Sequence, residues 1–240
     1  IRPGAHAHLV GIGGVSMSPL AEVLHNAGVV ISGSDLHESA AVSHLRSLGI
    51  PVVIGHRGES VQGAGCVIRT AAVHDDNPEI AAARAAGIPV FERAEAWGAI
   101  MRRYEHALCV AGTHGKTTTT SMCTHIFLAA QRDPTVMIGG TLPALGAGHR
   151  VGQGDTIILE SCEYCNSFLS FFPTVAVILN VDADHLDFFK DLEDVKHSFR
   201  RFAELVPQEG CVVADGDDAN TMDALLGAGA AHAHLWPGAG

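Results

Sequence analysis

A lysine that ends a short glycine-containing loop is the clearest chemical signal in this sequence. The segment 110–118 reads Val-Ala-Gly-Thr-His-Gly-Lys-Thr-Thr and lies between an apolar run and a helical pattern. In such a loop, backbone N–H groups hold the phosphates of ATP, Lys116 directs its charge toward the β and γ oxygens, and the Thr117 hydroxyl can bind Mg²⁺. The loop departs from the usual G-x-x-x-x-G-K-T pattern because its first glycine comes two residues later, at Gly112. We predict an ATP and magnesium site formed by Gly112, Thr113, His114, Gly115, Lys116, Thr117 and Thr118.

Polar residues follow two later apolar runs, at the point where each run ends. Glu160 follows the run 156–159, and the run 174–179 is followed by Asn180, Asp182, Asp184 and His185. An open parallel sheet collects its ligands at the carboxyl ends of its strands. Because Mg²⁺ prefers oxygen ligands, we predict a metal site made by Thr117 and Glu160. His185 is a less typical magnesium ligand and is included for its place opposite the loop.

A second glycine-rich turn lies near the start of the chain. Gly11, Gly13 and Gly14 follow the first apolar run and precede a helix, where backbone without side chains can approach a diphosphate. Ser16 stands where a full G-x-G-x-x-G pattern has its last glycine, and Asp35 stands where a dehydrogenase holds a ribose. From these residues alone, an NAD(P)-dependent oxidoreductase and a tight turn without a ligand both remain open.

The elements that must position these residues follow an alternating order. Short apolar runs alternate with helical patterns, which predicts an α/β protein with mainly parallel sheets. The first domain, predicted at 1–104, is Rossmann-like, with strands at 8–12, 29–32, 51–54, 66–70 and 88–91 and helices at 19–27, 40–48, 78–86 and 93–105. The second, 105–240, resembles a P-loop ATPase domain, with strands at 107–111, 156–159, 174–179 and 211–213 and helices at 116–130 and 194–205. The Ala/Gly-rich end, 226–240, shows no recognisable completion of its sheet, so we expect the natural chain to continue.

Composition excludes several classes of protein. Fifteen Lys plus Arg against 26 Asp plus Glu give a formal net charge of −11, so we expect no general affinity for nucleic acid. No apolar run approaches the ~20 residues of a membrane span, and the start lacks the pattern of a signal peptide, so we expect no membrane partner and a cytoplasmic location. Six scattered cysteines suit a reducing compartment. Cys162 and Cys165 form one C-x-x-C without a second pair, and we interpret them as two ordinary thiols rather than a redox or zinc site.

Taken together, the motifs resemble those of the Mur ligases. The segments that carry the resemblance are His8-Leu-Val-Gly-Ile-Gly-Gly14, Ser32-Gly-Ser-Asp35, Gly55-His56, Asp76-Asn-Pro-Glu79, Gly112-Thr-His-Gly-Lys-Thr-Thr-Thr119, Ile138-Gly-Gly140, Ser167-Phe-Leu169 and the region Asn180 to His185. The resemblance covers 7–218, nearly the whole chain. Its most specific parts are the shortened phosphate loop and the Asn-x-x-x-Asp-His element.

The resemblance implies a three-domain ATP-dependent ligase of peptidoglycan biosynthesis, here without its third domain. Within the family the chain is most similar to members that join L-alanine to the lactyl carboxylate of UDP-N-acetylmuramate through an acyl phosphate. The first domain is then expected to bind the UDP-sugar and the second ATP with Mg²⁺. Because the third domain closes over both, we expect the chain alone to be inactive.

The resemblance also implies roles for individual residues. The residues expected to contact the UDP-sugar are Gly11, Gly13, Gly14, Ser16, Ser34, Asp35 and Thr70. Thr117 and Glu160 would hold one magnesium ion, and His185 would hold a second. Lys116 and His114 would lie at the reacting centre, and Asn180 near ATP.

The sequence departs from the family pattern at several positions. Ser16 replaces a common Gly, Thr70-Ala71 replaces a common Ser-Ser, and the segment 160–165, Glu-Ser-Cys-Glu-Tyr-Cys, replaces a more acidic one. Glu160 and Glu163 are retained, but Cys165 cannot act as the usual Asp would. Three alternatives stay open: a recycling ligase that joins a murein tripeptide to the same UDP-sugar, a binding module without turnover, and the oxidoreductase.

Overall fold

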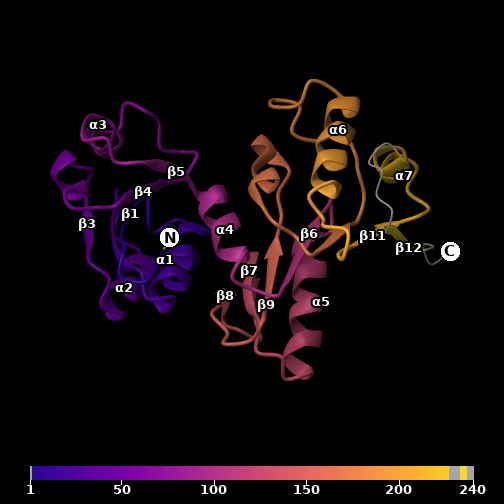
Figure 1. Ribbon diagram of the computed structural model, residues 1–240, viewed down its shortest axis with the longest axis horizontal. Helices are drawn as coiled ribbons and strands as arrows, with labels where there is room; N and C mark the ends of the chain where they lie inside the picture. The colour runs from indigo at the N-terminus through magenta and orange to yellow at the C-terminus, as the bar shows by residue number, and fades with distance from the viewer. Residues whose placement is uncertain (1, 227–232, 237–240) are drawn as a thin grey trace. The chain divides into compact units, whose positions relative to one another are not determined.

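The computed structural model describes residues 2–226 and 233–236, which fall into two compact units, Ile1–Ile100 and Met101–Gly240 (Figure 1). Helix α4 (Arg93–Met101) ends the first unit, and strand β6 (His106–Ala111) begins the sheet of the second. The domain boundary expected after Tyr104 stays a prediction. Each unit is an α/β layer structure built on its own sheet, as the alternation of runs predicts.

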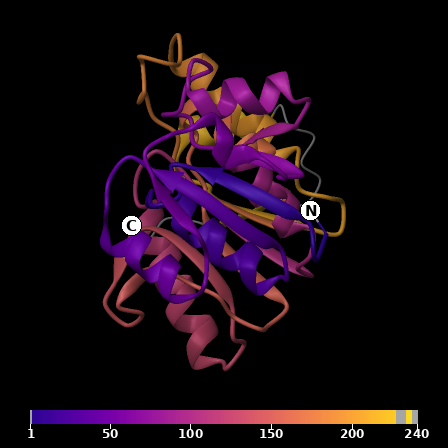
Figure 2. The same ribbon diagram turned by 90° about the vertical axis from the view of Figure 1, so that its left-hand side faces the viewer.

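The first unit is built on five parallel strands in the order β3-β2-β1-β4-β5. The strands are β1 (His6–Val10), β2 (Val30–Asp35), β3 (Val52–Ile54), β4 (Cys66–Arg69) and β5 (Val90–Glu92). In Figure 2 the helices α1 (Met17–Asn26) and α2 (Ala40–Ser47) lie on one side of this sheet and α3 (Pro78–Ala85) on the other. A short 3-10 helix, η1 (Gly58–Val61), packs against α3. Every strand and helix predicted for this unit is confirmed within a few residues.

Local chemistry explains where the helices of this unit begin. The Ser39 hydroxyl accepts a hydrogen bond from the Val42 N–H at the start of α2, and the Asn77 side chain accepts one from the Glu79 N–H at the start of α3. Pro78 occupies the first position of α3, where its missing N–H costs nothing. Helix α3 then buries Ile80 against the sheet. This start places the Glu79 side chain in the first turn, facing inward.

The second unit is built on a seven-stranded mixed sheet in the order β12-β11-β10-β6-β9-β7-β8. Besides β6, its strands are β7 (Thr135–Leu142), β8 (Ala147–Arg150), β9 (Thr156–Glu160), β10 (Val175–Ile178), β11 (Cys211–Asp215) and β12 (Ala233–Trp236). All pair in parallel except β8, which is antiparallel to β7. Helix α5 (Lys116–Ala129) packs against β6, β7 and β9, and α6 (Leu192–Ala203) packs against α7 (Ala219–Leu226).

Two parts of the second sheet differ from the sequence-based expectation. The β7–β8 hairpin is not predicted, because Gly139 and Gly140 interrupt the apolar pattern of β7 and β8 carries no alternation. The expectation that 226–240 hold no further part of the sheet is wrong, because β12 pairs in parallel with β11. Strand β12 has only four residues, none of them β-branched, and it lies in an Ala/Gly-rich segment, so its sequence gives little sign of a strand.

An aromatic cluster fixes the segment that follows β9. Phe168, in the 3-10 segment η2 (Tyr164–Ser170), stacks on Phe202 with ring centroids 4.5 Å apart and meets Phe199 edge to face at 5.4 Å. All three rings are fully buried. Within η2, Cys165 and Asn166 both adopt a left-handed backbone with φ of 54°. Such strain in residues other than glycine persists only where the surrounding structure holds it.

The cysteines and helices of the described residues bear on two sequence-based expectations. All six cysteines are free thiols, Cys162 and Cys165 among them. No helix in the part of the chain that the structure describes is long and apolar enough to cross a membrane. Cys109 lies fully buried in β6, and burial raises the pKa of its thiol to about 12. Cys165 is exposed.

These thiols give a test of the core. We expect iodoacetamide at mildly alkaline pH to label Cys165 in the native protein and to leave Cys109 unlabelled until the chain is unfolded, because only the accessible thiolate reacts. Peptide mass spectrometry of timed samples measures both sites. Equal labelling rates at the two cysteines in native protein would contradict the buried position of β6.

Candidate functional site

Three neighbouring parallel strands bring the residues of the second unit together. Strand β6 lies between β10 and β9, with Val110 beside Glu160 and Ala111 beside Ile178 in the register. The glycine loop follows β6, Glu160 ends β9, and Asn180 follows β10. Because the strands are parallel, these segments leave the same edge of the sheet. The structure therefore brings these three segments to one edge of the sheet.

The loop after β6 is held by the segment after β10. The Asn180 side chain accepts a hydrogen bond from the His114 N–H (2.8 Å) and donates one to the His114 carbonyl (3.1 Å). The Thr113 hydroxyl accepts one from the Asp182 N–H at 2.8 Å. Gly112 has φ of 138°, and a Cβ there would lie 3.0 Å from the Leu179 Cβ, so only glycine fits. The Asn180 side chain thus fixes the shape of the loop by binding the loop's backbone at His114.

Helix α5 begins without a capping side chain. Its N-cap residue is Gly115, with φ of 84°, which has no side chain to accept a hydrogen bond from the first turn. The N–H groups of a first helical turn have no partner within the helix, and the helix dipole places positive charge there. The start of α5 therefore offers N–H groups to an anion such as a phosphate.

Lys116 is held by a buried carboxylate and by the loop itself. Its ammonium donates to the Gly112 carbonyl at 2.6 Å and lies 3.1 Å from Glu163 Oε2. Glu163 is 1 % exposed, and its Oε1 lies 3.8 Å from His185 Nε2. A buried anion needs such partners because its desolvation is costly. Lys116 and His185 are thus brought together around Glu163.

A second carboxylate lies beside the first turn of α5. The Thr117 hydroxyl donates to Glu160 Oε1 at 3.0 Å, and the Gly139 N–H donates to Glu160 Oε2 at 2.7 Å. A Cβ at Gly139 would lie 2.7 Å from Glu160 Oε1, so glycine leaves the space that this carboxylate fills. The two predicted metal ligands Thr117 and Glu160 are therefore adjacent, and their oxygens suit a hard cation such as Mg²⁺.

His185 is held in a strained conformation at the same edge of the sheet. Its φ is 53°, an uncommon value outside glycine, and its ring lies 4.8 Å from that of Tyr164. The Tyr164 hydroxyl in turn donates to Asp187 at 2.9 Å. Strain of this kind gathers at functional sites.

Sequence reasoning missed two residues of this site. Glu163 and Gly139 were noted only as parts of the family pattern. The spacing of Glu163, three residues after Glu160, gives no sign that its carboxylate turns toward Lys116. Its partner Lys116 lies 47 residues earlier in the sequence.

The glycine turn of the first unit is built on β2. The Ser34 carbonyl accepts hydrogen bonds from the N–H groups of Gly11 and Ile12, both at 2.9 Å. The Asp35 carboxylate accepts one from the Gly13 N–H at 2.8 Å. Thr70 directly follows β4, and its methyl carbon would lie 3.1 Å from a Cβ at Gly11. The turn, Asp35 and Thr70 are thus brought together at the carboxyl edge of this sheet.

Two of the residues expected to contact the UDP-sugar have other partners. The Ser34 hydroxyl is fully buried, and it donates to Glu79 Oε2 at 2.5 Å. The Ser16 hydroxyl accepts a hydrogen bond from the Trp97 indole N–H at 3.3 Å. Ser34 therefore supports the turn from inside rather than presenting its hydroxyl at the surface.

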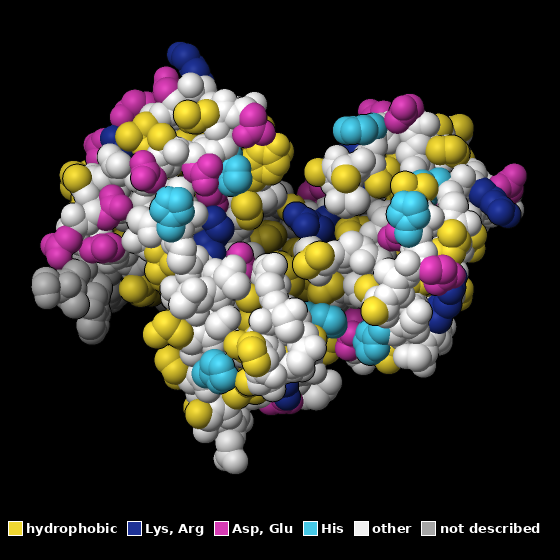
Figure 3. Space-filling view, turned by 180° about the vertical axis from the view of Figure 1, so that it is seen from behind, with side chains coloured by type: hydrophobic (Ala, Val, Ile, Leu, Met, Phe, Trp, Pro, Cys, Tyr) yellow, Lys and Arg dark blue, Asp and Glu magenta, His cyan; other side chains and the backbone are white. Residues whose placement is uncertain are grey.

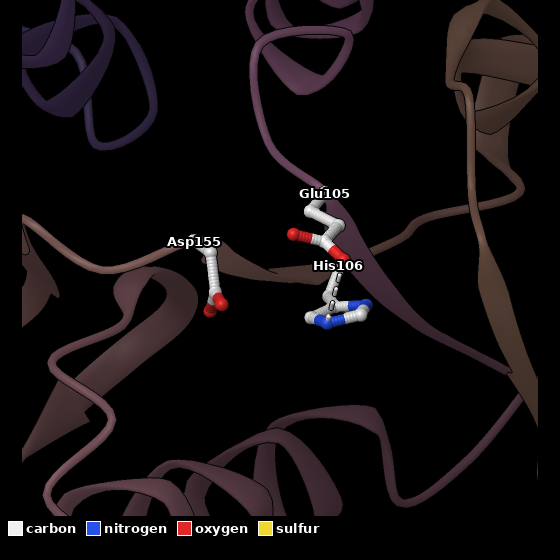
Figure 4. Close-up of side chains that lie close together, drawn as sticks. All are labelled: Glu105, His106 and Asp155. Carbon is white, nitrogen blue, oxygen red and sulfur yellow. Dashed lines mark ion pairs between the residues drawn. The ribbon is translucent and has the colours of Figure 1, made fainter.

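A further group of charged residues lies outside the two glycine turns. Glu105, His106 and Asp155 lie close together, and all three are exposed (Figure 4). They stand at the amino ends of β6 and β9, at the edge of the sheet opposite the glycine loop. On the face shown in Figure 3, Lys and Arg side chains lie singly or in small groups among acidic and His side chains. A phosphate ligand therefore depends on a few positioned groups.

Comparisons with known proteins agree with the geometry of both units. Residues 6–105 match the model of the Mur ligase family catalytic domain, and residues 110–234 match that of the Mur ligase middle domain. UDP-N-acetylmuramate–L-alanine ligases of Acetivibrio thermocellus and Caldanaerobacter subterraneus are each 50 % identical over 220 residues, 92 % of this chain. These residues make up 47 % and 48 % of the two relatives, so the chain spans about half their length.

Solved structures give the same result. The UDP-N-acetylmuramate-alanine ligase of Thermotoga maritima is 32 % identical with a TM-score of 0.80, covering 91 % of this chain and 51 % of that one. A ligase from Neisseria meningitides, named for UDP-N-acetylmuramate and L-alanyl-γ-D-glutamyl-meso-diaminopimelate, is 27 % identical with a TM-score of 0.88, covering 97 % and 78 %. A dehydrogenase assignment leaves the second unit unexplained, so the oxidoreductase alternative is set aside. The chain belongs to the Mur ligase family.

Proposed function

We propose that this chain supplies the UDP-sugar and ATP sites of a ligase that joins L-alanine to UDP-N-acetylmuramate in the cytoplasm. The observation that carries the proposal is the phosphate loop with Lys116 directed toward Glu163 and Thr117 against Glu160, in a chain 50 % identical to ligases of that name. The first unit adds a glycine turn with an adjacent carboxylate, Asp35. This arrangement suits a diphosphate bound at the start of α1.

The proposed reaction has two chemical steps. The lactyl carboxylate attacks the γ-phosphorus of ATP, which forms an acyl phosphate and releases ADP. The amine of L-alanine then attacks the acyl carbon, and the tetrahedral intermediate collapses to the amide with loss of phosphate. Charge builds up on the phosphoryl oxygens in the first step, so positioned positive groups accelerate it.

Several residues of the second unit would each take a separate part in the proposed reaction. Lys116 would exchange its contact with Glu163 for the phosphate oxygens, while the free N–H groups at the start of α5 hold the same phosphates. Asn180 keeps the loop in shape through His114, whose exposed side chain would lie near the reacting carboxylate. Glu163, freed from Lys116, would keep His185 in place.

The donor set around Glu160 fits a magnesium ion. Thr117 and Glu160 would hold it through oxygen, and His185 would hold a second ion in the same region. Bound Mg²⁺ would offset the charge of the phosphates.

A second candidate function is ligation of a murein tripeptide to the same UDP-sugar. The likeness to the Neisseria meningitides ligase favours it, because that structure covers 97 % of this chain. Rates with L-alanine and with the tripeptide in the full natural protein separate the two candidates. A clear preference for the tripeptide would replace the L-alanine assignment.

Calorimetric titration tests the first-unit site. We expect saturable binding of UDP-N-acetylmuramate to this chain and no binding of NADH. Binding of NADH with no binding of the UDP-sugar would contradict the proposed function.

The lysine of the loop gives a second test. We expect Lys116→Ala to lower the rate of ATP-dependent ligation in the full natural protein by at least about 100-fold, as for the loss of one transition-state donor. UDP-N-acetylmuramate affinity should stay unchanged, because its site lies in the other unit. Lys190→Ala, which removes an exposed lysine outside the site, is the control. Near-normal turnover of Lys116→Ala would show that the loop does not hold the reacting phosphates.

Two adjacent glycines give a third test. A Cβ at Gly139 would displace the Glu160 carboxylate, whereas a Cβ at Gly140 would meet only the Thr117 methyl group at an ordinary 3.5 Å. We expect Gly139→Ala to weaken the affinity for ADP in the presence of Mg²⁺ by about tenfold, the loss of one hydrogen bond to a charged group. Gly140→Ala should change it little. Calorimetry with and without Mg²⁺ measures both, and equal effects of the two variants would argue against Glu160 as a metal ligand.

A further inference from the structure

A connected network of polar side chains lies inside the first unit, between its sheet and α3. Residues two apart on a strand share a face, so His6 and His8 of β1 lie on the same side as Ser32 and Ser34 of β2. Glu79, in the first turn of α3, contacts His8 and Ser34 from the side of the sheet that α3 covers. His8, Ser34 and Glu79 are at most 1 % exposed. None of the chemistry described above uses His6, His8 or Glu79.

The network runs from the protein surface to Glu79. His6 lines a concave surface together with His25 and Pro51, and its Nδ1 lies 3.1 Å from the Gly63 carbonyl. Its Nε2 lies 2.7 Å from the Ser32 hydroxyl, which in turn lies 2.9 Å from His8 Nδ1. His8 Nε2 then lies 3.5 Å from Glu79 Oε1. One chain of contacts therefore links a solvent-facing histidine to a buried carboxylate.

Glu79 is ionised in this setting. Burial by itself would raise its pKa, but the nearby His8, the hydrogen bond from Ser34 and the neighbouring His56 outweigh burial and lower it. Its Oε2 already accepts from the Ser34 hydroxyl at 2.5 Å and from His56 Nδ1 at 3.0 Å. A helix N-terminus further favours an anion in the first turn.

Glu79 is joined to the nucleotide turn through Ser34. The Ser34 hydroxyl donates to Glu79, while its carbonyl accepts the N–H groups of Gly11 and Ile12. The next residue, Asp35, accepts the N–H of Gly13. The conformation of the turn that would meet the diphosphate thus depends on where Ser34 is held.

We propose that Glu79 is a positioning residue for the UDP-sugar site, acting through Ser34. The inference rests on the proposed function for the identity of the ligand alone. Glu79 Oε2 accepts from both the Ser34 hydroxyl and His56 Nδ1, so it holds the two side chains together beneath the turn. Removing the anion frees the Ser34 hydroxyl.

The test compares Glu79→Gln with Glu22→Gln in this chain. Glu22 is also paired with a histidine, His44 at 3.1 Å, but on the outer surface of the same unit, so it is a matched control. Calorimetry measures the affinity for UDP-N-acetylmuramate and, separately, for ADP with Mg²⁺. We expect Glu79→Gln to weaken UDP-sugar binding by at least about tenfold, the loss of one hydrogen bond to a charged group, with ADP binding unchanged. Glu22→Gln should change neither affinity.

Backbone NMR of the turn gives a second readout. We expect Glu79→Gln to shift the amide signals of Gly11, Ile12 and Gly13, whose N–H groups are held by Ser34 and Asp35, while Glu22→Gln leaves them in place. Unchanged amide signals at these three residues in Glu79→Gln would overturn the positioning role.

The outcomes separate this inference from the proposed function. If the unaltered chain binds no UDP-N-acetylmuramate, the proposed function fails, and the amide signals of the turn still decide the positioning role. If it binds and Glu79→Gln binds equally well, the positioning role is wrong. Should Glu79→Gln fail to fold, Ser34→Ala removes only the hydroxyl that links Glu79 to the turn. Unchanged UDP-sugar affinity in Ser34→Ala would likewise overturn the positioning role.

Discussion

Parallel pairing of β6 with β9 and β10 is the constraint on which the second unit depends. It brings the phosphate loop, Glu160 and Asn180 to one edge although they lie far apart in the sequence. Hydrogen bonds from Asn180 then fix the loop, and the loop fixes the start of α5. Each later contact of the site, such as that between Thr117 and Glu160, follows from this order of strands. A substitution at the end of β6, β9 or β10 is therefore expected to affect the residues at the other two strand ends.

Both units bury a glutamate carboxylate and stabilise it in related ways. Each buries a glutamate next to a glycine turn, Glu79 in the first unit and Glu163 in the second, and each surrounds it with cationic or polar partners. A buried carboxylate without partners is costly, so these groups hold one another in place. In the second unit the partner, Lys116, is also the group that would meet the phosphates. In the first unit the partners lie beneath the turn and would not touch the ligand.

Much of this arrangement could be predicted from the sequence, and the reasons are local. The α/β class follows from alternating apolar and helical patterns, and the loop around Lys116 follows from glycine spacing between a strand and a helix. The inward turn of Ser34 could not be predicted, because its partner Glu79 lies 45 residues later in the chain. The contact of Glu163 with Lys116 could not be predicted either, because the two residues lie 47 positions apart in the sequence. The β7–β8 hairpin could not be predicted because Gly139, which leaves space for Glu160, interrupts the apolar pattern of β7.

The uncapped start of α5 links the stability of this helix to its ligand. A side-chain cap contributes about 0.5–2 kcal/mol to a helix, and α5 does without it. Phosphate oxygens would take the place of that cap, so the first turn gains protection against hydrogen exchange only when nucleotide is present. The local opening of α5 is then governed by nucleotide concentration, while the strands beneath it keep their own stability. Hydrogen exchange in the first turn of α5 would thus show whether nucleotide is bound, without any movement of the sheet.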